Sequence, residues 1–337
     1  MVASPQTLPR YLLAVDGGGS GTRVAVARSD NPLTELARGY AGPSGLALGV
    51  ESAWGAIAAA CLQAFDQAGL PLVWEDCFMG CGLAGVNHAP WRQAFIDQAP
   101  GLAGLCVEGD AYSTLLGAHG GQAGVVIALG TGSIGMALTK HGEVRVVGGF
   151  GFPSGDEASG AALGLKVIAH AQRAVDGRGP HDALAQALLL AVMGEEAANS
   201  NLADSGEERQ RGLAMAVGAE GAYRISSRAR ERLLAWLVSA DQTRYATLAP
   251  IVAAHSTHPF ASSLLEQAGT DVSTMVRALD PAAELPLALC GSLAPIIAPF
   301  LPPSRAHLLV SPVGDAVSGA MQIAAAGAAA AGRSLPY

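Results

Sequence analysis

Two glycine-rich turns, each set between two apolar runs, carry the residue types best suited to binding phosphate. The first turn reads Asp16, Gly17, Gly18, Gly19, Ser20, Gly21, Thr22, and the second reads Gly130, Thr131, Gly132, Ser133. Glycine lets the backbone approach a ligand closely, so that successive N–H groups form an anion-binding concavity. The hydroxyls of Thr22, Thr131 and Ser133 add donors. One such turn equally fits an ordinary β-hairpin, but two in one chain predict duplicated domains that hold a polyphosphate from both sides.

Asp16 adds a negative charge to the first turn. It ends the apolar run 11–15, where an ionised carboxylate is costly without a partner. Magnesium beside a phosphate would supply that partner, because it binds through one or two carboxylates together with water. We therefore expect Asp16 to orient Mg²⁺ at the polyphosphate.

These turns do not match the two most familiar nucleotide-binding patterns. No G-x-x-x-x-G-K-[ST] motif occurs, and Gly17–Gly21 is followed by the strand-like run 23–27 rather than by a helix. The pair resembles the first and second phosphate motifs of the actin/hexokinase/heat-shock-protein ATPase superfamily. That resemblance implies an α/β fold of two ribonuclease-H-like, actin-like ATPase domains, with ATP in the interdomain cleft.

Asp110 is the candidate catalytic base. It follows the apolar segment 104–108 and precedes a predicted helix. One reading makes it the N-cap of that helix, where its carboxylate would accept backbone N–H groups. The other makes it the general base that takes the proton of an attacking sugar hydroxyl during phosphoryl transfer. With both phosphate turns present we favour the base, and one residue can do both.

The stretch 148–160, GGFGFPSGDEASG, could hold a sugar. Gly149 allows close approach of the backbone, Phe150 could stack on an apolar sugar face, and Asp156 or Glu157 could bind hydroxyls. The alternative is a glycine-rich loop with a solvated Asp–Glu pair that caps a helix from Ala161.

This stretch closely resembles the Gly-Gly-Trp-Gly-x-x-x-Gly-Asp-Glu-x-Ser-Gly signature of N-acetylglucosamine kinases and bacterial glucosamine kinases, which are ATPases of the BadF/BadG/BcrA/BcrD type. Phe150 stands where Trp is frequent. The resemblance covers nearly the whole chain, including 16–22, 110, 130–133, 289–293 and 312–320.

The resemblance implies a kinase that transfers phosphate from ATP to the 6-hydroxyl of N-acetylglucosamine or glucosamine, with Asp110 as base. It also implies that Gly149, Phe150 and Asp156 contact the sugar, and that Gly291 and Ser292 lie near the adenosine of ATP.

One loop departs from the family pattern. Animal N-acetylglucosamine kinases place a sugar-binding Asn after the opening strands, whereas Gly42–Leu46 contains none. We expect Ser44 to substitute for it, and the choice between acetylated and free amino sugar stays open. Asn87 and His88 could line the same cleft, although a surface loop is the preferred reading.

A second function class shares this fold: the ATP-driven activators of benzoyl-CoA reductase and 2-hydroxyacyl-CoA dehydratase. They require a cluster-ligating Cys in a glycine-rich loop of the nucleotide domain. The five cysteines of this sequence (Cys61, Cys77, Cys81, Cys106, Cys290) lie in apolar settings instead. We interpret them as reduced core thiols.

The amino-acid composition limits the kinds of partner that the protein is expected to bind. The chain has 337 residues, a net charge of −8 and no cluster of Lys or Arg, which argues against nucleic acid or an anionic membrane as partner. Residues 1–10 are polar and do not resemble a signal peptide. We expect a cytoplasmic homodimer that binds ATP and a small amino sugar.

Hydrophobic periodicity predicts alternating strands and helices in the first half and a mostly helical region over 160–280. Strands are expected at 11–16, 23–28, 78–83, 104–108, 124–129, 133–138 and 285–290, with a short one at 310–312. Helices are expected at 52–68, 111–118, 161–174, 182–193, 228–239, 262–279 and from 315, and an exposed loop at 194–212. The predicted domains are 10–119 with the closing helix 315–332, and 120–312 with a helical insertion.

Overall fold

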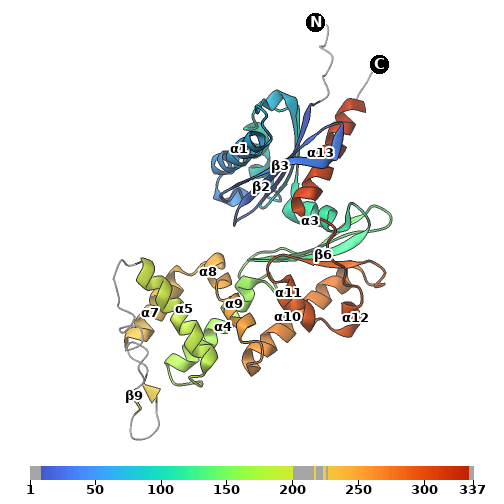
Figure 1. The fold of residues 1–337 in the computed structure, drawn as a ribbon. Coiled ribbons are helices and arrows are strands. Elements are labelled where there is room, and N and C mark those ends of the chain that lie inside the picture. Colours follow the sequence, from blue (N-terminus) through green and yellow to red (C-terminus); the bar gives the residue numbers. More distant parts are fainter. Residues whose placement is uncertain (1–8, 200–215, 218–222, 225–226, 334–337) are drawn as a thin grey trace.

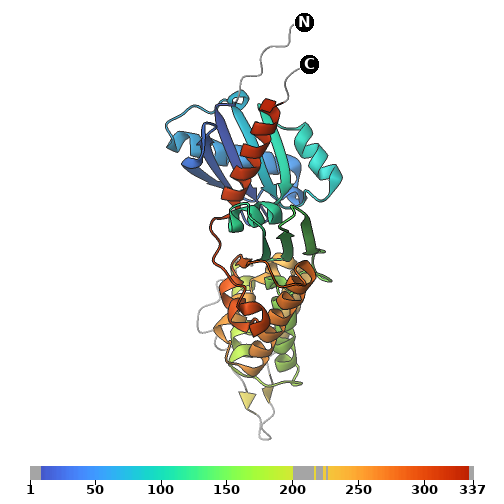
Figure 2. The same ribbon diagram turned by 90° about the vertical axis from the view of Figure 1, so that its right-hand side faces the viewer.

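The computed structural model describes residues 9–199, 216–217, 223–224 and 227–333. Figures 1 and 2 show an elongated molecule: an N-terminal sheet with its helices at one end, a second sheet near the middle, and a large group of helices beyond it. The first strand and the last helix lie side by side at the N-terminal end.

The N-terminal sheet has the strand order β3-β2-β1-β4-β5. Its strands are β1 (Tyr11–Gly17), β2 (Thr22–Arg28), β3 (Asn31–Ala41), β4 (Cys77–Leu83) and β5 (Gly104–Gly109). The strands β1, β4 and β5 run parallel to one another. The strand β2 is antiparallel to both of its neighbours, β1 and β3. The three parallel strands therefore bring their carboxyl ends to one edge, which is where a site is expected in such a sheet.

Helices cover both faces of this sheet: α1 (Val50–Gln67) with α2 (Ala89–Asp97) belongs to one side and α13 (Ala316–Arg333) to the other. Successive residues of β1 alternate between them, since Leu13 joins the core beneath α1 and Leu12 packs against α13. Burial on both faces explains why β1 reads as a continuous apolar run.

One helix, α3 (Asp110–His119), contacts both halves of the molecule. Its apolar residues, including Leu115, pack on the second sheet. Its other side approaches α13 so closely that a Cβ added to Gly319 would lie 1.8 Å from the Ser113 carbonyl oxygen. Only a glycine fits there, so the resemblance-based expectation that the last helix packs on the first domain is confirmed.

The second sheet has the order β11-β6-β7-β8, with β11 parallel to β6. Its strands are β6 (Gly124–Leu129), β7 (Ser133–Leu138), β8 (Val144–Gly148) and β11 (Leu287–Cys290), and a separate two-stranded ladder joins β9 (Ala216–Val217) to β10 (Tyr223–Arg224). The helices are α4 (Gly160–Val175), α5 (Ala183–Asn199), α7 (Ser227–Ser239), α8 (Gln242–Ala246), α9 (Ala249–Ala254), α10 (Pro259–Leu279), α11 (Ala294–Ile297) and α12 (Pro303–Ala306). Within the described residues, no helix is both long and apolar enough to cross a membrane.

The predicted strands and helices are confirmed within a few residues, with the following differences. The sequence analysis did not expect the strands β3, β8, β9 and β10 or the helices α2, α11 and α12. The predicted loop at 194–212 is wrong in its first part, because α5 continues to Asn199, and residues 200–212 lie outside the described residues. The predicted strand at 310–312 is also wrong, since pairing with β11 is limited to a single bridge at Leu309.

Candidate active site

The carboxyl ends of β1, β4 and β5 bring the two predicted acidic residues together. The sheet register aligns Asp16 with Gly82 and Gly82 with Glu108, and Asp110 follows at the end of β5. A Cβ added to Gly82 would lie 3.6 Å from the Cα of Asp110. The negative charge of Asp16 also acts on the Asp110 carboxyl.

Asp110 is the first residue of α3, not its N-cap. The cap residue is Gly109, and Asp110 Oδ1 instead accepts a hydrogen bond of 2.9 Å from the Ala111 N–H. Burial raises the pKa of the Asp110 carboxyl, and the nearby Asp16 raises it further, although the Ala111 bond opposes them. A carboxylate with a raised pKa accepts a proton more readily than an exposed one, as a general base must.

Asp16 is largely buried and paired. Its Oδ2 accepts bonds of 2.8 and 2.5 Å from Nε and Nη2 of Arg23, which lies opposite it in the β1–β2 register. Burial raises the pKa of Asp16, while Arg23 lowers it in part. The guanidinium therefore occupies the side of the carboxylate where a metal ion would compete.

A third carboxylate, Asp315, completes the acidic group, and sequence reasoning did not assign it a role. Its Oδ2 accepts a 2.5 Å bond from Nη1 of Arg38 and its Oδ1 a 3.0 Å bond from the N–H of Ser318 in the first turn of α13. Burial opposes ionisation, but Arg38 and Ser318 lower the pKa of Asp315 overall. Its charge raises the pKa of Asp16, so the two carboxylates face one region.

Arg23 was predictable, because a symmetric hairpin that pairs Gly17 with Thr22 must place it opposite Asp16. Arg38 and Asp315 are 277 residues apart, and only the fold reveals that they meet.

The tip of the first hairpin is exposed to solvent, but the hydroxyl of Thr22 at its end is buried. The Gly18 N–H donates to the Gly21 carbonyl at 3.1 Å, and Gly19 and Ser20 are exposed. In contrast, Thr22 is buried and its hydroxyl contacts the Gly42 carbonyl at 2.6 Å and the Ser44 hydroxyl at 2.7 Å.

This arrangement changes two predicted roles. Ser44 is fully buried behind the hairpin, and its N–H donates to the Gly18 carbonyl at 3.1 Å. In this structure Ser44 supports the first hairpin instead of facing a sugar, and the Thr22 hydroxyl supports it instead of facing phosphate.

The second hairpin also contains an internal backbone hydrogen bond, but its turn is one residue shorter than that of the first. The Gly130 N–H donates to the Gly132 carbonyl at 3.0 Å, and Thr131 is exposed at the tip. The Gly130 carbonyl accepts the N–H of Gly160 at 2.8 Å, and the Thr131 carbonyl accepts that of Ala161 at 3.1 Å. The first turn of α4 is thus attached directly to this hairpin.

Ser133 and Asp156 lie beneath the second hairpin. The Ser133 hydroxyl donates to the Glu157 carbonyl at 2.5 Å, so it is not free for a phosphate. Asp156 accepts the Ser133 N–H at 3.2 Å and Nε2 of Gln242 at 2.7 Å, and only 4% of it is exposed. Burial raises the pKa of the Asp156 carboxyl.

Each carboxylate oxygen of Asp156 thus has one protein donor in this structure, and a sugar contact of Asp156 stays a prediction. The alternative of a solvated Asp–Glu cap is wrong. Asp156 is buried, and the cap of α4 is Ser159, whose hydroxyl accepts the Ala162 N–H at 3.1 Å.

Four predicted contact residues remain exposed around the second sheet. Gly149 and Phe150 follow the end of β8, and Phe150 is 87% exposed. Gly291 and Ser292 follow β11, whose parallel pairing with β6 puts them beside the turn at Gly130. These residues are accessible to a ligand.

Three of the cysteines, Cys61, Cys77 and Cys81, are buried and unpaired, which confirms the prediction of core thiols for them. Burial raises the pKa of Cys77 to about 12 and that of Cys290 to about 11, so these sulfurs remain protonated. Cavities of about 490 and 190 Å³ lie against α13, and none of the predicted site residues lines them.

Comparison with known proteins gives concordant results. Residues 13–283 match the BadF/BadG/BcrA/BcrD ATPase family. The chain is 30% identical over 317 residues to glucosamine kinase GspK of Vibrio cholerae serotype O1, covering 93% of this chain and 95% of the relative. It is 29% identical over 175 residues to N-acetylmuramic acid/N-acetylglucosamine kinase of Clostridium acetobutylicum, covering 50% of this chain and 56% of the relative.

A solved structure is also similar: a candidate N-acetylglucosamine kinase from Chromobacterium violaceum, 41% identical, with a TM-score of 0.79, 95% of this chain covered and 100% of that one. This likeness and the two sheets confirm the predicted α/β fold class with two actin-like domains.

Proposed function

We propose that this chain, which belongs to the BadF/BadG/BcrA/BcrD ATPase family, is an ATP-dependent kinase that phosphorylates the 6-hydroxyl of glucosamine or N-acetylglucosamine. The observation that carries the proposal is the convergence of Asp16 and Asp110 at one sheet edge, joined to the second glycine hairpin by α3. Relatives named as amino-sugar kinases, over almost the full chain in one case, support the substrate class.

Asp110 acts as the general base in this proposal. It takes the proton of the 6-hydroxyl as that oxygen attacks the γ-phosphorus, and its burial keeps it basic enough to do so. General bases of this kind contribute about 10²–10⁴-fold to rate.

The acidic group suits a magnesium nucleotide. Asp16, Asp110 and Asp315 offer hard oxygen ligands, and Asp16 is the one we assign to the metal. When bound, Mg²⁺ neutralises negative charge on the phosphate oxygens during transfer. Arg23 then has to leave Asp16 Oδ2, and its exposed side chain is free to turn toward the anion.

The nucleotide would be held by open backbone at both hairpins: Gly18–Gly21 from the first sheet and Gly130–Gly132 from the second. Gly291 and Ser292 would contact adenosine, since they are exposed beside the second hairpin. The domains, 10–119 with 315–332 and 120–312, would enclose the cleft.

The sugar would bridge these domains, since Gly149 and Phe150 belong to the second and Asp110 to the first. Sugar binding is therefore expected to close the molecule and exclude water, which would otherwise hydrolyse ATP. The working form is proposed to be a cytoplasmic homodimer.

An assay that couples ADP release to a spectrophotometric signal tests the proposal against glucosamine, N-acetylglucosamine, N-acetylmannosamine and glucose. We expect Mg²⁺-dependent turnover with an amino sugar and very low ATPase activity without sugar. Turnover of ATP that no sugar stimulates would contradict a kinase and favour an ATPase activator of the dehydratase type.

A further inference from the structure

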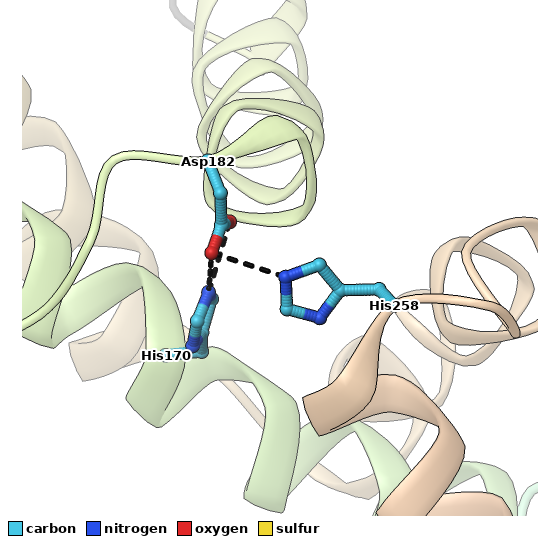
Figure 3. Close-up of side chains that lie close together, drawn as sticks. All are labelled: His170, Asp182 and His258. Carbon is cyan, nitrogen blue, oxygen red and sulfur yellow. Dashed lines mark hydrogen bonds and ion pairs between the residues drawn. The ribbon is translucent and has the colours of Figure 1, made fainter.

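A group of two histidines and one aspartate lies among the helices beyond the second sheet, outside the candidate active site. His170 comes from α4, Asp182 precedes α5, and His258 precedes α10. Their nearest ligand atoms all lie within 4.8 Å of one another. Figure 3 shows both imidazoles directed at the same carboxylate from two sides.

The carboxylate presents one oxygen to both rings. Asp182 Oδ1 accepts the Ala185 N–H at 2.9 Å, which fixes the orientation of the group. Its Oδ2 lies 2.9 Å from Nε2 of His170 and 3.1 Å from Nε2 of His258. Burial alone would raise the pKa of Asp182, but the Ala185 bond and the two imidazoles lower it to about 2, so it carries a negative charge at neutral pH.

Phe260 contacts the imidazole rings of both His170 and His258. The ring of Phe260 stacks on His170 with centroids 5.1 Å apart. Nδ1 of His258 accepts the Phe260 N–H at 3.2 Å. These contacts fix the positions of both rings in the metal-free group. The three side chains are 11%, 24% and 21% exposed, so an ion can reach them from solvent.

We propose that His170, Asp182 and His258 form a structural binding site for Zn²⁺ or a similar divalent transition metal. Two imidazole nitrogens and one carboxylate oxygen are a ligand set that zinc accepts, with water in the fourth position. Two nitrogen donors disfavour Mg²⁺ and Ca²⁺, which prefer oxygen. In a tetrahedral zinc site the ligand atoms lie about 3.3 Å apart. The two rings would therefore withdraw slightly from Oδ2, and their Nε2 atoms, which lie within 4.8 Å of each other, would move closer together.

Metal binding changes the proton positions in a defined way. In the metal-free group the Nε2 proton of His258 is donated to Asp182, because its Nδ1 is an acceptor. Coordination through Nε2 moves the proton to Nδ1 and replaces the 3.2 Å bond from Phe260 with a metal–nitrogen bond. Since the imidazoles must be unprotonated to bind the ion, metal affinity is expected to fall as the pH is lowered.

The ion would link α4 to the starts of α5 and α10. Because α4 begins at the second hairpin, the site would also brace the helix that supports Gly130 and Thr131. The expected consequence is stability rather than catalysis, so the proposal does not depend on the proposed kinase activity.

The test uses the full chain, stripped with EDTA, dialysed, and titrated with ZnCl₂ while bound metal is measured by plasma mass spectrometry and unfolding by calorimetry. We expect about one zinc ion per chain and a rise in Tm of about 5 °C at a hundredfold excess over Kd. Both effects should be lost in His170→Gln and in His258→Asn, where Asn keeps an acceptor for the helix cap.

His141→Asn is the matched control, because it removes an exposed histidine from the turn between β7 and β8 and should retain zinc and the Tm shift. Equal zinc uptake by wild type and His258→Asn would overturn the proposal. A wild-type Tm that does not change when zinc is added would also overturn it.

Discussion

The two glycine hairpins each contain an internal backbone hydrogen bond, but they differ in length and in what surrounds them. Four residues connect the paired ends of the first, and three connect those of the second. The first is bordered by ionic groups, with Asp16 paired to Arg23 and Asp315 nearby. The carbonyls of the second accept the first N–H groups of α4, and neutral donors from Ser133 and Gln242 hold the buried carboxylate of Asp156. The first turn therefore lies beside an ion pair, whereas the second is attached to a helix by hydrogen bonds from neutral donors.

Asp110→Asn is expected to have the largest effect. The amide keeps the shape and can still accept the Ala111 N–H, but it cannot take a proton, so kcat should fall by about 10²–10⁴-fold while folding and ATP affinity persist. Single-turnover kinetics with calorimetric ATP binding measure both. Near-normal turnover in a folded variant would exclude the base role.

The pH profile sharpens this prediction. Burial raises the pKa of Asp110 above its ordinary 3.8, and the ionised form is the active one, so kcat/KM should fall as pH decreases through a value above 3.8. In Asp110→Asn the residual rate should lose this acid limb. An unchanged limb would assign it to another group, such as Asp16, whose pKa burial also raises.

Asp16→Ala should reduce turnover less than Asp110→Asn does. It should raise the Mg²⁺ concentration needed for activity more than it raises the KM for sugar, because it removes a hard oxygen ligand beside the first hairpin. Magnesium titrations at saturating sugar provide the measurement. Lost sugar affinity with a normal metal requirement would place Asp16 at a different site.

Asp156→Ala should weaken the contacts that support the second hairpin. It leaves the buried Ser133 N–H and Gln242 without an acceptor, which costs about 1–3 kcal/mol of unfolding free energy. We expect the KM for ATP to rise more than the KM for sugar. If urea unfolding is unchanged and only the sugar KM rises, Asp156 contacts sugar directly, as the sequence resemblance implies.

Ser44→Ala should have the smallest effect. It removes one hydrogen bond to Thr22, worth about 1 kcal/mol, and should leave the sugar KM nearly unchanged. Thr22→Ser is a suitable control, because it keeps the hydroxyl. A sugar KM raised tenfold in a stable Ser44→Ala variant would contradict the supporting role.

Sequence patterns located the buried strands because burial on both faces leaves long apolar runs, as in β1 and β6. They missed β3 and β8 because these are edge strands with mostly exposed residues, so hydrophobicity does not alternate along them. The strands β5 and β11 also lie at sheet edges, but they are more buried and were predicted, so the accuracy of a strand prediction here follows burial.

The site was predictable where the signal was local and unpredictable where partners were distant. Glycine spacing identified both turns, and Asp16 and Asp110 followed from the ends of apolar runs. The burial of Asp156 depends on Gln242, 86 residues away, and the charge of Asp315 is balanced by Arg38 from a strand near the start of the chain. No local pattern encodes such contacts.

The position of α3 has a consequence for motion. The helix starts at Asp110, contacts the second sheet through Leu115, and meets α13 at a contact that only glycine permits. Under the proposed function, a rotation of one sheet relative to the other would therefore move Asp110 as well. Domain closure and the alignment of Asp110 with the phosphate turns would then be one coupled motion, and a substitution such as Gly319→Ala would disturb catalysis without touching either ligand.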